Sequence, residues 1–230
     1  MHSRLVVDKQ DGLRESTDAS SVSWPAWLRG IARFFSYLFH PVFVPVMLVF
    51  FIVFIHPYLF AGASGTQKIL VVVQAAAMCT FFPLVTVLLL KALDFISSIQ
   101  LTNQKDRIIP LIACGIWYFW LWYVWRNQPD YPQVAVQFAL ATWISASLAL
   151  MANIRMKISL HAIAAGVMLT FIILLALVQD LSFGIYISVA LLVTGIICTS
   201  RFIVSDHTAA EVYGGLALGA LSMILANQFG

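Results

Sequence analysis

Seven long apolar runs dominate the sequence, and their lengths constrain the fold more than any other feature. Each run is close to the roughly 20 residues that an α-helix needs to cross the hydrocarbon core of a bilayer. Because lipid offers the backbone no hydrogen-bond partners, these runs are predicted to be helices rather than open strands. Charged residues make up only 10% of the chain, against roughly 25% in soluble domains. The runs cover residues 34–60, 69–90, 108–125, 133–152, 158–179, 181–200 and 208–228.

The first of these runs contains Pro41, Pro45 and Pro57, which predict a kink or a tilt in its helix. The polar, mixed-charge residues 1–23 before it are predicted to form a disordered, solvated tail. No repeat or low-complexity tract divides the remainder, so residues 24–230 are expected to form one transmembrane domain. The predicted fold class is therefore all-α: a polytopic transmembrane bundle of six or seven helices.

Residue types and spacings exclude several classes of site. The three cysteines lie inside apolar runs and form no C-x-x-C pair, so neither a disulfide framework nor a zinc site is expected. The acidic residues are too few and too mixed with cations for a Mg²⁺ site, and no basic stripe suggests nucleic-acid binding. No metal, cofactor or nucleic-acid partner is therefore predicted. His40 and His56 are interpreted as structural residues at the membrane boundary. The cysteines are Cys79, Cys114 and Cys198.

The charged residues of the connecting segments gather on one side of the predicted bundle. If every apolar run crosses the membrane once, successive connections alternate between the two sides. Even numbers of crossings then bring the basic segments around Arg107, Lys157 and Arg201 to one surface. Ionisable residues in such places usually mark a functional site. One side receives Lys68, Arg126, Asp130 and Asp180, and the other receives Lys91, Asp94, Lys105, Asp106, Arg107, Arg155, Lys157, Arg201, Asp206 and Glu211.

Two histidines belong to this more highly charged surface. His161 follows Ser159 near the start of the fifth run, and His207 precedes Glu211 by four residues at the start of the seventh. The i,i+4 spacing puts His207 and Glu211 on one face of a helix. A carboxylate in that position can hold one imidazole nitrogen and increase the basicity of the other. Nucleophilic catalysis needs such a base with an orienting group.

The segment around His207 resembles the third motif of the type 2 phosphatidic acid phosphatase superfamily. That motif reads Ser-Arg, five residues, His, three residues, Asp. The chain matches its spacing at every position with Ser200, Arg201, His207 and Glu211, and Glu replaces the terminal Asp. The resemblance implies the helical phosphatase core of that superfamily.

The other two motifs of the family are matched in part. The second, Pro-Ser-Gly-His, retains Ser159 and His161 but lacks the Pro and the Gly. The first, Lys, six residues, Arg-Pro, retains Arg107, whereas Gln100 occupies the Lys position and the Pro is missing. Lys105 is a candidate substitute for that Lys through a local shift.

The resemblance implies a role for each matched residue. His207 would attack phosphorus and become phosphorylated, with Glu211 orienting it. His161 would protonate the leaving group and then activate water. The family works without a metal or another cofactor, so side chains would stabilise the charge on the phosphoryl oxygens. The phosphate-binding candidates are Arg201, Arg107, Ser159 and Lys105.

The activity implied is that of an integral-membrane phosphatase, which hydrolyses a phosphate monoester or diphosphate on a lipid through a phosphohistidine. Phosphatidate, phosphatidylglycerophosphate, polyprenyl diphosphate and a lipid A phosphate all fit, and the expected partners are this substrate and the membrane lipids. Two alternatives remain open: a phosphotransferase with an alcohol acceptor, and a non-catalytic phospholipid-binding or transport protein. The expected location is the inner (plasma) membrane of a bacterium. Basic residues before the first run favour a cytoplasmic site, whereas bacterial family members commonly face outward, so the side is left open.

Overall fold

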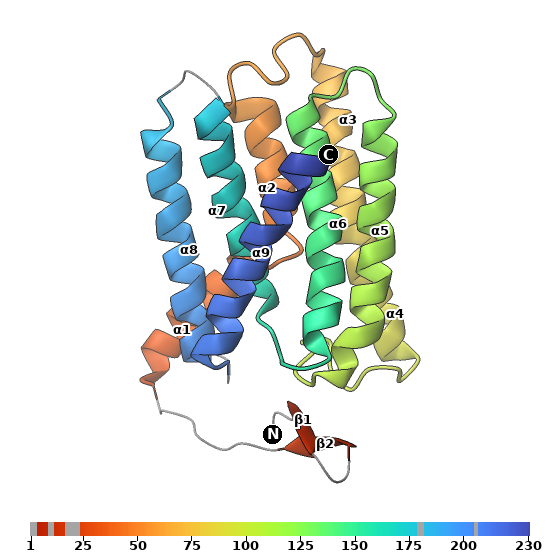
Figure 1. Cartoon of the computed structure of the whole chain (residues 1–230), viewed down its shortest axis with the longest axis vertical. Helices are drawn as coiled ribbons and strands as arrows, with labels where there is room; N and C mark the ends of the chain where they lie inside the picture. The colour runs from red at the N-terminus through yellow and green to blue at the C-terminus, as the bar shows by residue number, and fades with distance from the viewer. Residues whose placement is uncertain (1–3, 9–11, 17–23, 179–181, 205–206) are drawn as a thin grey trace.

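The computed structural model describes residues 4–8, 12–16, 24–178, 182–204 and 207–230. Among these residues, six helical segments are long and apolar enough to cross a membrane, which indicates an integral membrane protein (Figure 1). Two of the six segments combine several elements. The first comprises α3 (Gly65–Ala76), η2 (Ala77–Phe81) and α4 (Phe82–Ala92), and the second comprises η3 (Lys105–Arg107) and α5 (Ile108–Arg126). The others are α6 (Gln133–Asn153), α7 (Leu160–Val178), α8 (Gly184–Val204) and α9 (Ala209–Phe229).

The first apolar run does not form one helix across the bundle. It is divided between α1 (Ala26–Leu38) and α2 (Val44–Phe50), and α2 continues into a π-helical turn, η1 (Phe51–Ile55). Pro41 gives the physical reason, because it has no N–H for a helical hydrogen bond and its ring disfavours helical angles at the preceding residue. The prediction of one kinked or tilted helix is therefore wrong here: the chain breaks between α1 and α2. The segment Val44–Ile55 falls below the length of a single span.

Before α1, the structure describes a short antiparallel hairpin of β1 (Arg4–Asp8) and β2 (Gly12–Ser16). It lies in the segment for which the sequence predicts a disordered tail. A hairpin of only two strands is marginally stable in water. The other residues of that segment, 1–3, 9–11 and 17–23, lie outside the described residues. The tail therefore stays a prediction.

The connections α4–α5, α6–α7 and α8–α9 lie at one end of the bundle, which we call the motif end (Figure 1). The chain enters α1 at this same end, whereas α9 finishes at the opposite end (Figure 1). This arrangement confirms that even numbers of crossings bring the three basic segments to one surface. Asp180 and Asp206, which the sequence analysis assigned to opposite sides, lie outside the described residues.

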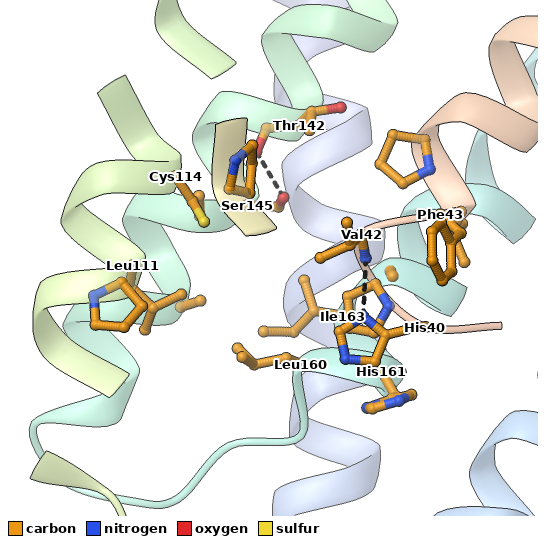
Figure 2. Close-up of a pocket in the computed structure, with 18 of the residues that line it drawn as sticks. His40, Val42, Phe43, Leu111, Cys114, Thr142, Ser145, Leu160, His161 and Ile163 are labelled. Atoms are coloured by element: carbon orange, nitrogen blue, oxygen red, sulfur yellow. Dashed lines mark hydrogen bonds between the residues drawn. The ribbon is translucent and has the colours of Figure 1, made fainter. Parts of the chain in front are cut away.

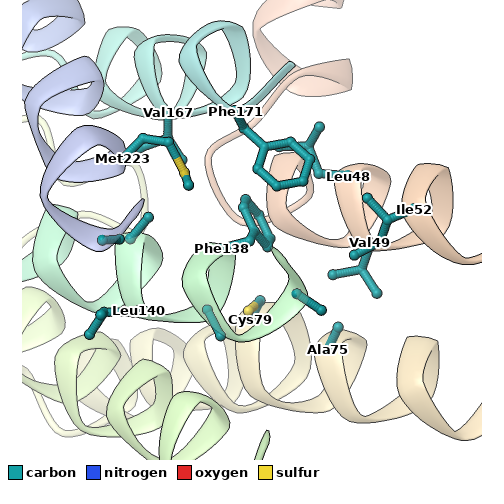
Figure 3. Packing of buried hydrophobic residues seen from close by; sticks show 14 of the residues in the cluster. Leu48, Val49, Ile52, Ala75, Cys79, Phe138, Leu140, Val167, Phe171 and Met223 are labelled. Carbon is teal, nitrogen blue, oxygen red and sulfur yellow. The ribbon is translucent and has the colours of Figure 1, made fainter. Parts of the chain in front are cut away.

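Large apolar side chains fill the middle of the bundle. The rings of Phe138 in α6 and Phe171 in α7 lie 5.2 Å apart between centroids. Leu48, Val49 and Ile52 pack beside them from the α2–η1 segment, and all three are buried (Figure 3). The short α2 segment is therefore part of the core, and it brings the break between α1 and α2 into the bundle.

Helices α7 and α9 approach so closely that glycine is required between them. A Cβ added at Gly219 would overlap the backbone carbonyl of Ile163, and one added at Gly166 would overlap that of Leu216. Gly215, the other glycine of the G-x-x-x-G sequence, faces the same contact. Close helix packing of this kind is typical of a G-x-x-x-G sequence in a membrane helix. The contact joins the helix that carries His161 of the second motif to the helix that carries Glu211 of the third.

Candidate functional site

A cavity of about 460 Å³ opens among the helices at the motif end. Four residues singled out in the sequence line it: Arg107, His161, Arg201 and His207. They come from the end of η3, the first turn of α7, the last turn of α8 and the segment just before α9. The fold therefore brings to one cavity four side chains that are far apart along the chain.

His207 is held by Glu211, as their spacing predicts. Nδ1 of His207 lies 3.2 Å from Oε2 of Glu211, and both side chains are buried. Because a carboxylate only accepts hydrogen bonds, Nδ1 carries the proton and Nε2 keeps its lone pair. Nε2 is therefore the atom of His207 that can act as a nucleophile.

The surroundings of His207 keep its ring neutral. The pKa of His207 is lowered to about 4, chiefly by burial and also by the positive charges of Arg107 and Arg201. The hydrogen bond to Glu211 acts in the opposite direction and raises the pKa. At neutral pH the ring is thus unprotonated at Nε2, which is the state that nucleophilic attack requires.

Glu211 has a second task at the start of α9. The N–H of Thr208 donates to Oε2 of Glu211 at 2.9 Å, and the N–H of Glu211 donates to the hydroxyl of Thr208 at 3.3 Å. These two reciprocal bonds form a capping box that begins the helix. One carboxylate oxygen therefore fixes both the helix start and the His207 ring. An Asp side chain is one methylene shorter and reaches back less far, which gives a physical reason for Glu at this position.

Two backbone carbonyls fix the guanidinium group of Arg107. Nη1 donates to the carbonyl of Ile158 at 2.8 Å, and Nε donates to that of Leu101 at 2.9 Å. Leu101 has a left-handed backbone, with φ at 51°, where the loop turns toward α5. Arginine has more N–H donors than these two bonds use. The side chain is thus held at the cavity wall with donors left for an anion.

Ser36 of α1 contacts two of the predicted site residues. Its carbonyl oxygen lies 3.1 Å from Nε2 of His161, and its hydroxyl oxygen accepts from Nη1 of Arg201 at 3.3 Å. Because a carbonyl cannot donate, Nε2 of His161 carries the proton and Nδ1 keeps a lone pair. Helix α1 therefore forms a wall of the site that the sequence analysis missed. The sequence gives no signal for its contact with His161, because that contact uses a backbone carbonyl.

His40 is a second residue that sequence reasoning missed. Its ring lies edge to face with that of His161, 5.1 Å apart between centroids, and lines the same cavity. Figure 2 shows the two rings close together beside Val42, with Leu111 and Cys114 across the cavity. The sequence signal is the His-Pro dipeptide, whose turn breaks the helix and places the imidazole inside the bundle.

Two other predicted phosphate-binding residues are not among those that line the cavity. Ser159 is fully buried; its hydroxyl accepts from the N–H of Ala162 at 3.4 Å, and its own N–H donates to the carbonyl of Glu211 at 3.1 Å. Lys105 is exposed in the turn before α5. Gln100, at the position of the family's Lys, does line the cavity. The phosphate-binding roles of Ser159 and Lys105 stay predictions, while the observed bonds of Ser159 join the starts of α7 and α9.

The inner part of the cavity is apolar and extends along the bundle. Tyr118 also lines it, eleven residues beyond Arg107 along one helical segment, or about 16 Å at 1.5 Å per residue. The hydroxyls of Thr142 and Ser145 face it too, but both donate to carbonyls of their own helix. The charged end therefore opens into an apolar inner part of the cavity, which we call the apolar chamber.

Within the described residues, no three His, Cys, Asp or Glu side chains form a group that could hold a metal ion. No family model, curated protein or solved structure matches the chain. What marks this region as a candidate site is therefore its geometry. Imidazole and guanidinium groups from η3, α7, α8 and the segment just before α9 surround one cavity, and Tyr37 of α1 also lines it.

Proposed function

We propose that this chain is an integral-membrane phosphatase that hydrolyses a phosphate monoester or diphosphate on a lipid. The proposal rests on His207, a neutral imidazole that is held by Glu211 in a cavity shared with two arginines and a second histidine. A nucleophile with an orienting carboxylate, surrounded by cations, suits phosphoryl transfer to the protein. The resemblance of the three sequence motifs supports the same activity.

In the proposed reaction, Nε2 of His207 attacks phosphorus, and the bond between phosphorus and the leaving oxygen breaks. His161, protonated in the substrate complex, gives its proton to that oxygen. Arg107 and Arg201 offset the charge on the phosphoryl oxygens through planar, bidentate contacts. The neutral His161 then takes a proton from water. The oxygen of this water attacks phosphorus, breaks its bond to His207 and leaves as part of inorganic phosphate.

The apolar chamber supports a lipid as the substrate. Its charged end would bind the phosphate, and its inner part would take a hydrocarbon chain. At about 460 Å³, the cavity lies toward the small end of the range for ligand pockets, which suits one hydrocarbon chain better than the two chains of a diacyl lipid. We therefore propose that one chain enters the bundle while the rest of the lipid stays in the bilayer.

Product analysis tests the activity directly. The purified chain, in mixed micelles with phosphatidate and a metal chelator, is expected to release inorganic phosphate faster than micelles without protein. Adding an alcohol acceptor separates the alternatives, because a phosphotransferase would yield a phosphorylated acceptor in place of inorganic phosphate. Binding of the lipid with neither product would show a non-catalytic binding or transport protein and would overturn the proposal.

Filling the chamber is expected to change chain-length preference. Ala146 of α6 is buried and lines the cavity, so an Ala146→Phe side chain occupies space meant for the substrate chain. We expect kcat/KM for a long-chain lipid phosphate to fall about tenfold or more, with little change for a short-chain one. Ala217→Phe adds the same ring at an exposed position of α9 and serves as the control. Equal losses on both substrates would show that the chain lies elsewhere.

A further inference from the structure

Two His-Pro turns flank the short α2–η1 segment, and they are built alike. At the first, the N–H of Val42 donates to Nδ1 of His40 at 3.4 Å. At the second, the N–H groups of Tyr58 and Leu59 donate to Nδ1 of His56 at 3.3 and 3.2 Å. Each imidazole thus accepts a backbone hydrogen bond that closes its own turn. This shared task explains why a histidine suits both positions structurally.

The surroundings of the two rings differ. His56 packs among aromatic rings, with centroids 6.3 Å from Phe51 and 5.9 Å from Phe183, and is not among the residues that line the cavity. His40 lies against His161 and lines the cavity together with Arg201. Its role in closing a turn is sufficient to explain His56. For His40 the second ring nitrogen faces the site, and turn closure does not explain that nitrogen.

The turn also settles which nitrogen of His40 carries the proton. An N–H can donate only to a nitrogen with a lone pair, so Nδ1 is unprotonated and the neutral ring carries its proton on Nε2. Among the described residues, Nε2 of His40 has no hydrogen-bond partner. It is also not one of the polar atoms that are buried away from solvent without a partner. His40 therefore presents an N–H donor to a cavity that already contains two guanidinium groups.

We propose that His40 is a third histidine of the site, whose Nε2–H donates a hydrogen bond to a phosphate oxygen of the bound lipid. The inference rests on the proposed function for the identity of its anion. A neutral donor strengthens anion binding without adding to the repulsion among the cations already present. The His-Pro turn fixes the ring beforehand, so little reorganisation is needed when the anion binds.

Two replacements at His40 separate its role in closing the turn from its role as a hydrogen-bond donor. His40→Asn keeps a short side-chain acceptor that can close the turn, as Asn does in Asx turns, but it removes the donor at the Nε2 position. His40→Gln has a longer side chain that can place an amide N–H near that position. His56→Asn makes the same His-to-Asn replacement in the second His-Pro turn, whose histidine does not line the cavity.

We expect His40→Asn to lower kcat/KM for phosphate release from a lipid phosphate about ten- to a hundredfold, the effect of losing a hydrogen bond to a charged group. His40→Gln should recover part of this loss, and His56→Asn should match the wild type. Unfolding temperatures in detergent should be similar for all variants in the absence of phosphate. Added inorganic phosphate should raise the unfolding temperature of the wild type and of His56→Asn more than that of His40→Asn.

The outcomes separate this inference from the proposed function. If the wild type releases phosphate and His40→Asn does so equally well, His40 is only a turn residue and the inference fails alone. If the wild type releases none but inorganic phosphate still stabilises it through His40, the anion site stands and the enzyme proposal fails. If the wild type releases no phosphate and added inorganic phosphate does not stabilise it, both the inference and the proposed function are wrong. Should His40→Asn lower the unfolding temperature without added phosphate and His40→Gln recover nothing, the role is structural and the inference fails.

Discussion

Under the proposed function, replacing His207 with alanine is expected to lower phosphate release from a lipid phosphate on the order of a thousandfold or more, because removing a covalent nucleophile leaves only binding and charge stabilisation. The reason lies in the geometry at the start of α9, where Glu211 holds Nδ1 and leaves the Nε2 lone pair toward a cavity with two guanidinium groups. Initial rates of inorganic phosphate release in mixed micelles measure the effect. His56→Asn is the control for a buried histidine outside the cavity.

A covalent intermediate gives the same prediction an independent readout. Rapid quenching of the wild type with labelled substrate should reveal acid-labile, alkali-stable phosphate on the protein, as expected for phosphohistidine. His207→Ala should carry no such label. His161→Ala should retain the label longer, because the base that activates water is gone. Wild-type rates in His207→Ala, or an unchanged label, would exclude His207 as the nucleophile.

Replacing Gly219 with alanine is expected to destabilise the protein by about 3 kcal/mol and to reduce activity with it. The added Cβ would overlap the backbone carbonyl of Ile163, and a backbone atom cannot turn aside as a side chain can. Helix α7 would have to move away from α9. Because His161 is in α7 and Glu211 is in α9, the distance between these two side chains would change as well.

Gly214 supplies a matched control on the same helix. A Cβ added there meets nothing within 4 Å, so Gly214→Ala should be neutral or slightly stabilising, as for an unhindered helical position. Thermal unfolding of both variants in detergent, with phosphate release measured beside it, checks the comparison. Equal stability of the two variants would mean that α7 and α9 pack less tightly than the structure indicates.

The membrane architecture could be predicted because its signals are local. The length of an apolar run fixes whether a helix can cross a bilayer, and counting crossings puts Arg107, His161 and His207 at one end. The break after α1 was harder to predict. Pro41 is visible in the sequence, but a proline in an apolar run is compatible with a kink as well as with a full break. Only packing against the rest of the bundle decides between them.

Motif spacing made some contacts of the candidate site predictable. Contacts between segments that are distant along the chain could not be predicted from the sequence. The spacing of His207 and Glu211 predicted their contact, which the structure shows at 3.2 Å. Ser36 could not be identified in this way, because its contact with His161 uses a backbone carbonyl, which every residue type possesses. His40 was missed because a histidine that closes a turn has the same local sequence whether or not it faces a site. The phosphate-binding role of Ser159 stays a prediction from the resemblance, and the bonds that the structure shows for it join the starts of α7 and α9.

The placement of α1 also fixes where the reaction product goes. The chain enters α1 at the motif end, and α9 finishes at the other end (Figure 1). Under the proposed function, inorganic phosphate is therefore liberated into whichever compartment the entrance to α1 faces, and the lipid product remains in the adjoining leaflet. The accessibility of a short epitope placed before Trp24 therefore shows on which side of the membrane the phosphate is released.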